Sequence, residues 1–211
     1  MFADIFGKGK IMSNRHKIVL ATNNLDKQAE MNNVLSDLGL DLLTLNQFPE
    51  IGEIQETGIT LLENSFIKAR TVFNMTGLAS LADDTGLEVD ALNGAPGVFS
   101  SRYAGENVSY EENVKKILDD LKDVPFGKRS ARFKTVISFV TSSTELSTDG
   151  VLTGMIATEQ KGSNGFGYDP VFLVNSLGQT LAEISPSKKN EISHRAIALR
   201  KMKDIIKQNI K

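Results

Sequence analysis

A strand–helix–strand pattern near the start of the sequence limits the fold of this chain more than any other feature. Residues 17–22 form a short apolar run that ends at Asn23, which predicts a buried strand running into a turn. From Leu25 onward, apolar residues recur at helical spacing, and Gly39 stands where such a helix would end. Residues 40–45 are predicted to form a second strand. This order of elements favours an α/β fold that contains a parallel pair of strands.

The rest of the chain adds helices and long strands to this start. Residues 61–75 and 109–121 are predicted helices, because a Thr or Ser at the start of each has Glu three residues later, the spacing of a capping box. Residues 132–141 and 146–158 alternate and are rich in β-branched side chains, which predicts two long antiparallel strands. Residues 192–206 have the amphipathic pattern of a terminal helix.

Composition and charge exclude several classes of protein. The 211 residues are 40% hydrophobic and no Pro/Gly/Ser-rich linker divides them, so we expect residues 17–211 to form one domain after an N-terminal extension, residues 1–16. The extension lacks the hydrophobic stretch of a secretory signal, and no apolar run approaches the roughly 20 residues that span a bilayer. We therefore expect a cytoplasmic protein with no membrane partner. The net charge of −2 argues against a nucleic-acid partner.

The scarcity of cysteine and histidine restricts the chemistry that the chain can perform. There are no cysteines and only two histidines, which excludes disulfides, thiolate metal sites, a Cys nucleophile and a His-rich metal cluster. A metal bound by this chain would therefore be held mostly by carboxylate oxygens, which indicates Mg²⁺ or Mn²⁺.

Two polar segments are candidates for binding phosphate and metal. Residues 22–27 join the first strand to the first helix, where free N–H groups and the helix dipole suit phosphate, although an Asn cap beside a surface lysine explains this segment alone better. Residues 83–86, Asp-Asp-Thr-Gly, follow a predicted strand at 78–82. Two adjacent carboxylates can bind a divalent ion and activate water, and a turn capped by the Asp side chains is the alternative. Glu56 could complete such a metal site, although a solvated surface acid explains this residue alone better.

Two further polar segments are candidates for contacting a flat ligand. Residues 162–170 combine three glycines with Phe166 and Tyr168, so the backbone can approach a ligand while a ring stacks on it. Residues 189–195 end in Ser-His-Arg near the start of a predicted helix, where they either cap the helix or contact a ligand. Plain turns and surface decoration explain each segment singly. Together the four segments provide what a nucleotide hydrolase needs.

Six motifs occur in an order typical of one family: Thr22-Asn-Asn-x-x-Lys27, Glu56-Thr-Gly58 with Glu63-Asn64 and Lys68-Ala-Arg70, Ala82-Asp-Asp-Thr-Gly-Leu87, Gly94-Ala-Pro-Gly97 with Ser101-Arg-Tyr-Ala-Gly105, Gly165-Phe-Gly-Tyr-Asp-Pro170, and Ile192-Ser-His-Arg195. In these motifs the chain resembles the inosine triphosphate pyrophosphatases, from about Lys17 to Lys207. The resemblance implies an elongated mixed β-sheet flanked by helices, with two lobes and a nucleotide cleft between them. It also implies a homodimer that needs Mg²⁺, or Mn²⁺ in its place.

The resemblance further implies an activity and a set of site residues. The activity is hydrolysis of ITP, dITP and XTP to the monophosphate and pyrophosphate, which cleanses the nucleotide pool. Asp84 is expected to accept a proton from water with Asp83 as its supporting neighbour, and Glu56 and Asp84 to hold the metal. The expected substrate-binding residues are Thr22, Asn23, Asn24, Lys27, Lys68, Thr85 (where the family usually has Ser), Phe166, Gly167, Tyr168, Asp169, Lys189, His194 and Arg195.

Three other functions compete with this hypothesis. A related hydrolase could act on modified pyrimidine or methylated nucleotides, but segments 166–169 and 193–195 favour purines. A regulatory module could sense a triphosphate without cleaving it, but such a module has little use for Glu56, Asp83 and Asp84 together. A nucleic-acid-binding protein is disfavoured by the net charge and by the lack of a basic stripe.

Overall fold

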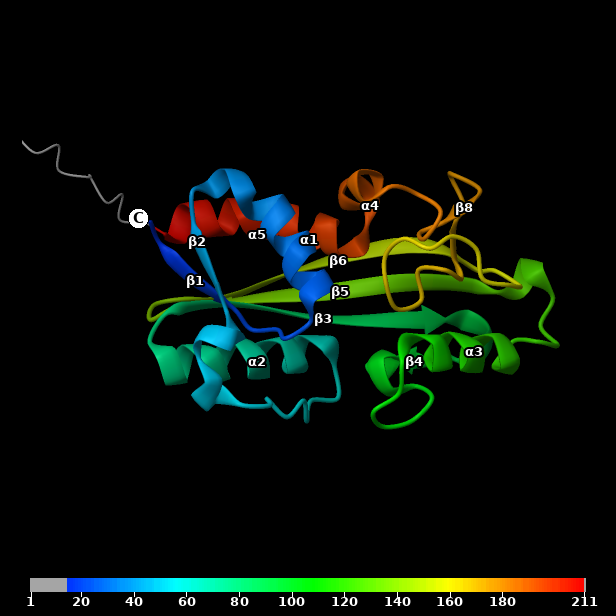
Figure 1. The fold of residues 1–211 in the computed structure, drawn as a ribbon, viewed down its shortest axis with the longest axis horizontal. Coiled ribbons are helices and arrows are strands. Elements are labelled where there is room, and N and C mark those ends of the chain that lie inside the picture. Colours follow the sequence, from blue (N-terminus) through cyan, green and yellow to red (C-terminus); the bar gives the residue numbers. More distant parts are fainter. Residues whose placement is uncertain (1–14, 211) are drawn as a thin grey trace, which may run out of the picture.

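The computed structural model describes residues 15–210 and has the predicted α/β fold, an elongated mixed sheet with helices on both faces (Figure 1). The predicted extension therefore lies almost entirely outside the described residues. The strands are β1 (Lys17–Leu20), β2 (Asp41–Thr44), β3 (Ala79–Val89), β4 (Pro96–Gly97), β5 (Ser130–Val140), β6 (Glu145–Ile156), β7 (Phe172–Val174) and β8 (Gln179–Thr180). The helices are α1 (Leu25–Leu35), α2 (Leu61–Thr76), α3 (Tyr110–Asp120), α4 (Pro186–Ile192) and α5 (His194–Asn209).

The sheet combines a short parallel part with a long antiparallel part. Its strand order is β2-β1-β3-β5-β6-β7-β8, and β4 pairs with β3 alone. β1 is parallel to both β2 and β3, which confirms the predicted parallel pair. β3, β5 and β6 are antiparallel and form the long ribbon that runs through the molecule, as the alternating pattern of β5 and β6 predicted. The division into two lobes stays a prediction.

The helices form a layer on each side of the sheet. Figure 1 shows α1, α4 and α5 over one face and α2 and α3 over the other. Alternation along β1 serves both layers, because Ile18 and Leu20 belong to the core under α1 and α5 while Val19 packs in the core with α2. A third core holds α3 against the far end of the ribbon. No helix among residues 15–210 is long and apolar enough to cross a bilayer.

The helix ends follow the short-range signals in the sequence. Thr60 caps α2, its hydroxyl accepts from the backbone N–H of Glu63, and the Glu63 carboxylate accepts from the Thr60 N–H. Ser109 and Glu112 form the same capping box at α3. Both predicted capping boxes are thus confirmed. Gly39, the predicted helix stop, follows a helical segment in the left-handed region that suits glycine, and Gly77 ends α2 in the same way.

The predicted strand end at residue 82 is wrong, because β3 runs without interruption from Ala79 to Val89. Asp83, Asp84 and Thr85 pair across the sheet with β5 instead of turning. Polar residues followed by glycine are typical of turns, but here ion pairs with Lys27, Lys68 and Arg195 hold the two carboxylates within the strand. Gly86 does not form a turn. A glycine is needed there because a Cβ would lie 2.6 Å from the carbonyl oxygen of Gly97.

The predicted terminal helix, residues 192–206, is confirmed as α5, and a short helix that was not predicted, α4, precedes it. Ser193 has an extended backbone (φ −66°, ψ 155°), ends α4 and caps α5, where its hydroxyl accepts from the Ala196 N–H. The start of α4 carries its own signals, a Ser185 cap followed by Pro186 in the first turn. The consequence is that Lys189 and Arg195 lie on different helices.

The start of α5 lies directly on β6, and Gly150 makes this possible. A Cβ at Gly150 would lie 2.1 Å from the carbonyl oxygen of His194 and 2.7 Å from the Ala198 nitrogen. We expect Gly150→Ala to lower the free energy of unfolding by about 1–3 kcal/mol, because α5 must shift away from the sheet. Urea unfolding measures the change.

Gly127→Ala is the matched control, since a Cβ at that residue meets nothing within 4 Å. It should change the free energy of unfolding by less than about 0.5 kcal/mol. If the two variants unfolded alike, the close contact between α5 and β6 would be contradicted.

Candidate active site

The candidate site is a cavity of about 810 Å³, part of it open to solvent, where the starts of α1, α3 and α5 meet β3 and the loop before β7. The sheet edge explains its position. β1 borders β3 only as far as Leu81, and β4 borders it only from Leu87, so the residues between them have a free edge. The predicted site residues that line the cavity are Asn24, Lys27, Glu56, Asp84, Thr85, Phe166, Gly167, Tyr168, Asp169, Lys189, His194 and Arg195.

Four predicted site residues do not line this cavity. Thr22 is buried, and its hydroxyl accepts from the Asn24 N–H at 3.2 Å, so it shapes the phosphate-loop candidate from beneath. Asn23 is exposed beside it. Lys68 and Asp83 are buried under the cavity and contact its lining residues. These two act on the site through their neighbours.

Other lining residues escaped the sequence-based prediction. Phe133 belongs to the alternating pattern of β5 and resembles any core residue, while Tyr110 is the first residue of a capped helix. Glu30 also escaped the prediction; it does not line this cavity, but its carboxylate contacts the lining residues Lys189 and Arg195, and it follows Lys27 by almost one helical turn. That spacing on α1 is the one signal in the sequence that could have found Glu30.

Asp83 forms the most deeply buried ion cluster of the site. Its Oδ2 accepts from Arg195 Nε at 3.0 Å and lies 3.1 Å from Lys27 Nζ, and its side chain has no exposed area. Burial alone would raise the pKa of Asp83, but Lys27 and Arg195 outweigh it and hold the pKa well below its usual range. Asp83 is therefore a fixed negative charge that connects α1, β3 and α5.

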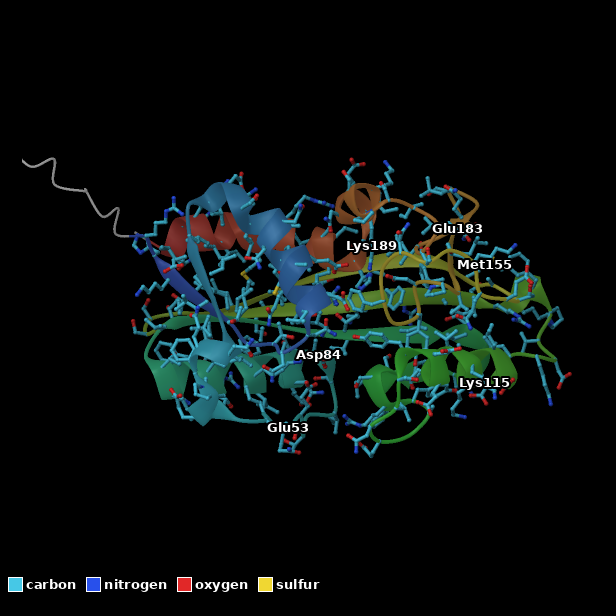
Figure 2. All side chains as sticks on the ribbon, in the orientation of Figure 1. Glu53, Asp84, Lys115, Met155, Glu183 and Lys189 are labelled. Carbon is cyan, nitrogen blue, oxygen red and sulfur yellow. The ribbon has the colours of Figure 1, made fainter. Side chains whose placement is uncertain are left out.

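Glu30 extends this network toward the loop before β7. Its carboxylate pairs with Arg195 and, at 2.9 Å, with Lys189, whose Nζ also lies 2.5 Å from Asp169. Burial opposes ionisation of Glu30, yet Arg195 and Lys189 together lower its pKa. Figure 2 shows Lys189 on α4 and Asp84 on β3, at separate parts of the site. Through Glu30, the positions of α4, which carries Lys189, and α5, which carries Arg195, are thus fixed relative to α1 by ion pairs.

Asp84 and Glu56 converge on a single cation, which is the arrangement a metal site needs. Lys68 Nζ lies 3.0 Å from Glu56 Oε1 and 3.4 Å from Asp84 Oδ1. The other Asp84 oxygen is buried without a hydrogen-bond partner. The pKa of this carboxyl is raised, and burial is the largest cause. Among residues 15–210, no cluster of three or more acids or histidines could hold a metal. Two carboxylates fit Mg²⁺, which keeps waters and substrate phosphates as its other ligands.

The opposite part of the cavity is aromatic. The ring of Phe166 has Lys189 Nζ 4.5 Å and Arg195 Cζ 5.5 Å from its centroid. The His194 imidazole stacks on Phe133 with centroids 4.5 Å apart, and burial, followed by repulsion from Arg195 and Lys189, lowers its pKa well below the usual value. His194 is therefore neutral near pH 7, and its buried Nδ1 has no partner. This part suits a flat, polar-edged ring.

A model of the Ham1 family matches residues 18–205. The chain belongs to the Ham1 family. Among its relatives, a dITP/XTP pyrophosphatase of Elusimicrobium minutum (strain Pei191) is 48% identical over 196 residues, which cover 90% of this chain and 100% of the relative. A dITP/XTP pyrophosphatase of Thermoanaerobacter sp. (strain X514) is 47% identical over 190 residues, which cover 90% and 96%.

Solved structures of Ham1 proteins have the same fold. The HAM1 protein from Coxiella burnetii matches with a TM-score of 0.84 and 45% identity, covering 92% of this chain and 99% of that chain. The Ham1 protein of Staphylococcus aureus matches with a TM-score of 0.82 and 36% identity, covering 91% and 98%. The α/β architecture of this Ham1-family chain is thus shared over almost its full described length.

The neutral state of His194 makes stability depend on pH. Below the ordinary His pKa of 6.5 the unfolded chain binds a proton that the folded chain excludes, so stability is lost as pH falls. We expect His194→Phe, which keeps a ring on Phe133, to remove this loss. Relative to the wild type, the free energy of unfolding of the variant should rise by up to about 1.4 kcal/mol for each pH unit below the ordinary His pKa. Urea unfolding at several pH values measures the difference.

Comparing the two proteins cancels the opposite contribution of Asp84, whose raised pKa makes protonation favour the folded state. His16→Phe, at the exposed second histidine, controls for the loss of a histidine as such. Parallel stability curves for the wild type and His194→Phe would contradict the neutral, buried state of His194.

Proposed function

We propose that this Ham1-family chain hydrolyses the triphosphates of inosine, deoxyinosine and xanthosine to the monophosphate and pyrophosphate. The observation that carries the proposal is the cavity itself, in which a charged part with Lys27, Asp84 and Glu56 adjoins an aromatic part where Phe166 lies beside Lys189 and Arg195. A nucleotide has the same two parts, a polyanion and a flat ring. The dITP/XTP pyrophosphatase relatives support this choice of substrate.

The residues of this chain divide the work at the triphosphate. The N-terminus of α1, capped by Asn24, offers backbone N–H groups to phosphate, and Lys27 and Lys68 add positive charge. Glu56 and Asp84 would hold Mg²⁺, or Mn²⁺, which would neutralise the triphosphate and polarise its α-phosphate. The buried position of Lys27 favours binding of a polyanion, because phosphate oxygens can replace the water that burial removes from its ammonium group.

Asp84 is positioned to activate the attacking water. Its partner-free oxygen can accept the proton as the water oxygen bonds to the α-phosphorus. The bond from that phosphorus to the oxygen of the leaving pyrophosphate breaks in line with the attack. Asp83 does not touch the reacting atoms in this scheme, because its one paired oxygen holds Lys27 and Arg195 in place. It is a positioning residue.

Base selection follows from hydrogen-bond polarity at the aromatic end. Inosine and xanthine present a keto oxygen at position 6, whereas adenine presents a donor there. A buried donor in the pocket facing another donor costs on the order of 1–3 kcal/mol, which reduces binding of adenine nucleotides. His194, with its neutral ring and unpaired Nδ1, supplies one of the buried polar atoms at this end.

We also propose a cytoplasmic homodimer, as the family resemblance implies. Large apolar side chains that stay exposed in the single chain, such as Ile59 at 82% and Phe99 at 57%, give apolar surface to a second copy. The nucleotide pool that the proposed activity serves is cytoplasmic.

A panel of nucleoside triphosphates with Mg²⁺ tests the proposed activity. Pyrophosphate and orthophosphate are measured separately, and rapid pyrophosphate release from ITP or XTP with little from ATP is the expected result. Orthophosphate as the first product would mean attack at the terminal phosphate and would overturn the mechanism. Turnover confined to modified pyrimidines would favour the related hydrolases, and binding without turnover a sensor.

Asp84→Asn should lower turnover of ITP about 10²–10⁴-fold while the fold survives. The variant removes the proton acceptor but keeps the size of the side chain. Because the pKa of Asp84 is raised in the folded state, its charge opposes folding at neutral pH, so the melting temperature should stay the same or rise. Pyrophosphate release and thermal unfolding measure the two effects.

Asp204→Asn, an exposed position on α5, is the matched control and should behave as the wild type. A near-normal rate in Asp84→Asn would show that another group accepts the proton.

A further inference from the structure

Tyr110 connects the two ends of the cavity although no motif includes it. It is the first residue of α3, and its hydroxyl accepts from Asn24 Nδ2 at 2.7 Å, across the mouth of the cavity. Its ring centroid lies 5.9 Å from that of Phe166, with the ring planes at 41°. The residue is 44% exposed. One side chain thus contacts both the phosphate-binding loop and the aromatic end.

The backbone that carries Tyr110 is held firmly. Ser109 and Glu112 form a capping box around it, and Val114 and Ile117 bury the next turns of α3 in the core. Asn113 fixes the preceding loop, since its side chain accepts from the Ala104 N–H and donates to the Ser101 carbonyl. The half-exposed phenol ring can therefore turn about its own side-chain bonds while its point of attachment stays in place.

The present contacts of Tyr110 exclude a nucleotide from two places. A flat base inserted between two rings needs about 7 Å, twice an aromatic contact distance of about 3.5 Å, and the Tyr110–Phe166 separation is 5.9 Å. The Asn24 amide, at the N-terminus of α1, is occupied by the phenol hydroxyl instead of an anion. Both obstacles disappear together if the ring rotates.

We propose that Tyr110 is a nucleotide-binding residue, which gives up its hydrogen bond with Asn24 and contacts the substrate instead. On binding, its ring packs on the nucleotide beside Phe166, and the released Asn24 amide donates to the triphosphate. The inference rests on the proposed function and extends it, since it identifies a wall of the substrate pocket on α3. In this arrangement α3 closes the pocket with a ring, opposite the cations of α4 and α5.

The alternative role for Tyr110 is a latch that only joins α1 to α3. The two roles depend on different atoms, because a latch requires the hydroxyl and a stacking wall requires the ring. Tyr110→Phe keeps the ring and removes the bond to Asn24. Tyr110→Ala removes both.

Calorimetric binding of inosine monophosphate and steady-state hydrolysis of ITP test the proposal on the full chain. Tyr110→Ala should raise Kd and KM on the order of tenfold, the usual loss for removing one ring that stacks on a base. Its kcat should change little, because the ring binds substrate and transition state alike. Tyr110→Phe should bind as tightly as the wild type or more tightly, since Asn24 is then free. Phe126→Ala, at a similarly exposed aromatic (45%) that does not line the cavity, should match the wild type.

Thermal unfolding accompanies each variant. A wild-type Kd in a folded Tyr110→Ala protein would overturn the proposal, and so would equal weakening in Tyr110→Phe and Tyr110→Ala, which is the signature of a latch. Failure of the proposed function looks different, because the wild type itself would then release no pyrophosphate from purine triphosphates. Binding of inosine monophosphate would still decide the role of Tyr110 in that case.

Discussion

The carboxylate of Asp83 is the constraint on which the rest of the structure depends. An ion taken fully out of water costs several kcal/mol unless it is paired, and Asp83 has no exposed area. Its partners come from α1, through Lys27, and from α5, through Arg195, so these helices must dock together on β3 for the charge to be compensated. Glu30 then completes the pairing of Arg195 and brings in α4 through Lys189. Packing and electroneutrality thus specify the same arrangement.

The gap in the sheet edge explains why this buried network can also form a site. Between the end of β1 and the start of β4, β3 has no neighbour on one side, so groups on both of its faces reach one opening. Successive strand residues point to opposite faces. Asp83 and Thr85 therefore meet Arg195 on the α5 side, while Asp84 meets Lys68 of α2 on the other. A continuous edge would have separated these two groups of side chains.

The sequence predicted local features well and long-range ones poorly. The caps at Thr60 and Ser109 depend on residues three positions away, so their signal is complete in the sequence. The strand through Asp83 depends on Arg195, more than a hundred residues later, and without that partner a turn was the better prediction. The six ordered motifs identified most of the residues that line the cavity. Phe133 was missed because a residue facing the cavity and a residue facing the core have the same alternating pattern.

The two adjacent aspartates show how environment divides chemistry between identical side chains. Burial disfavours the charge of both, but Asp83 touches two cations, which lower its pKa, whereas Asp84 shares Lys68 with Glu56 and keeps a raised pKa. Asp83 is therefore fixed in its charged state, and its Oδ2 alone holds both cations. Each carboxylate keeps one buried oxygen without a partner, but Asp84 lines the cavity and Asp83 does not. Carboxyls whose pKa values are pushed apart in this way suit the division proposed above, with Asp83 as a structural charge and Asp84 as the proton acceptor.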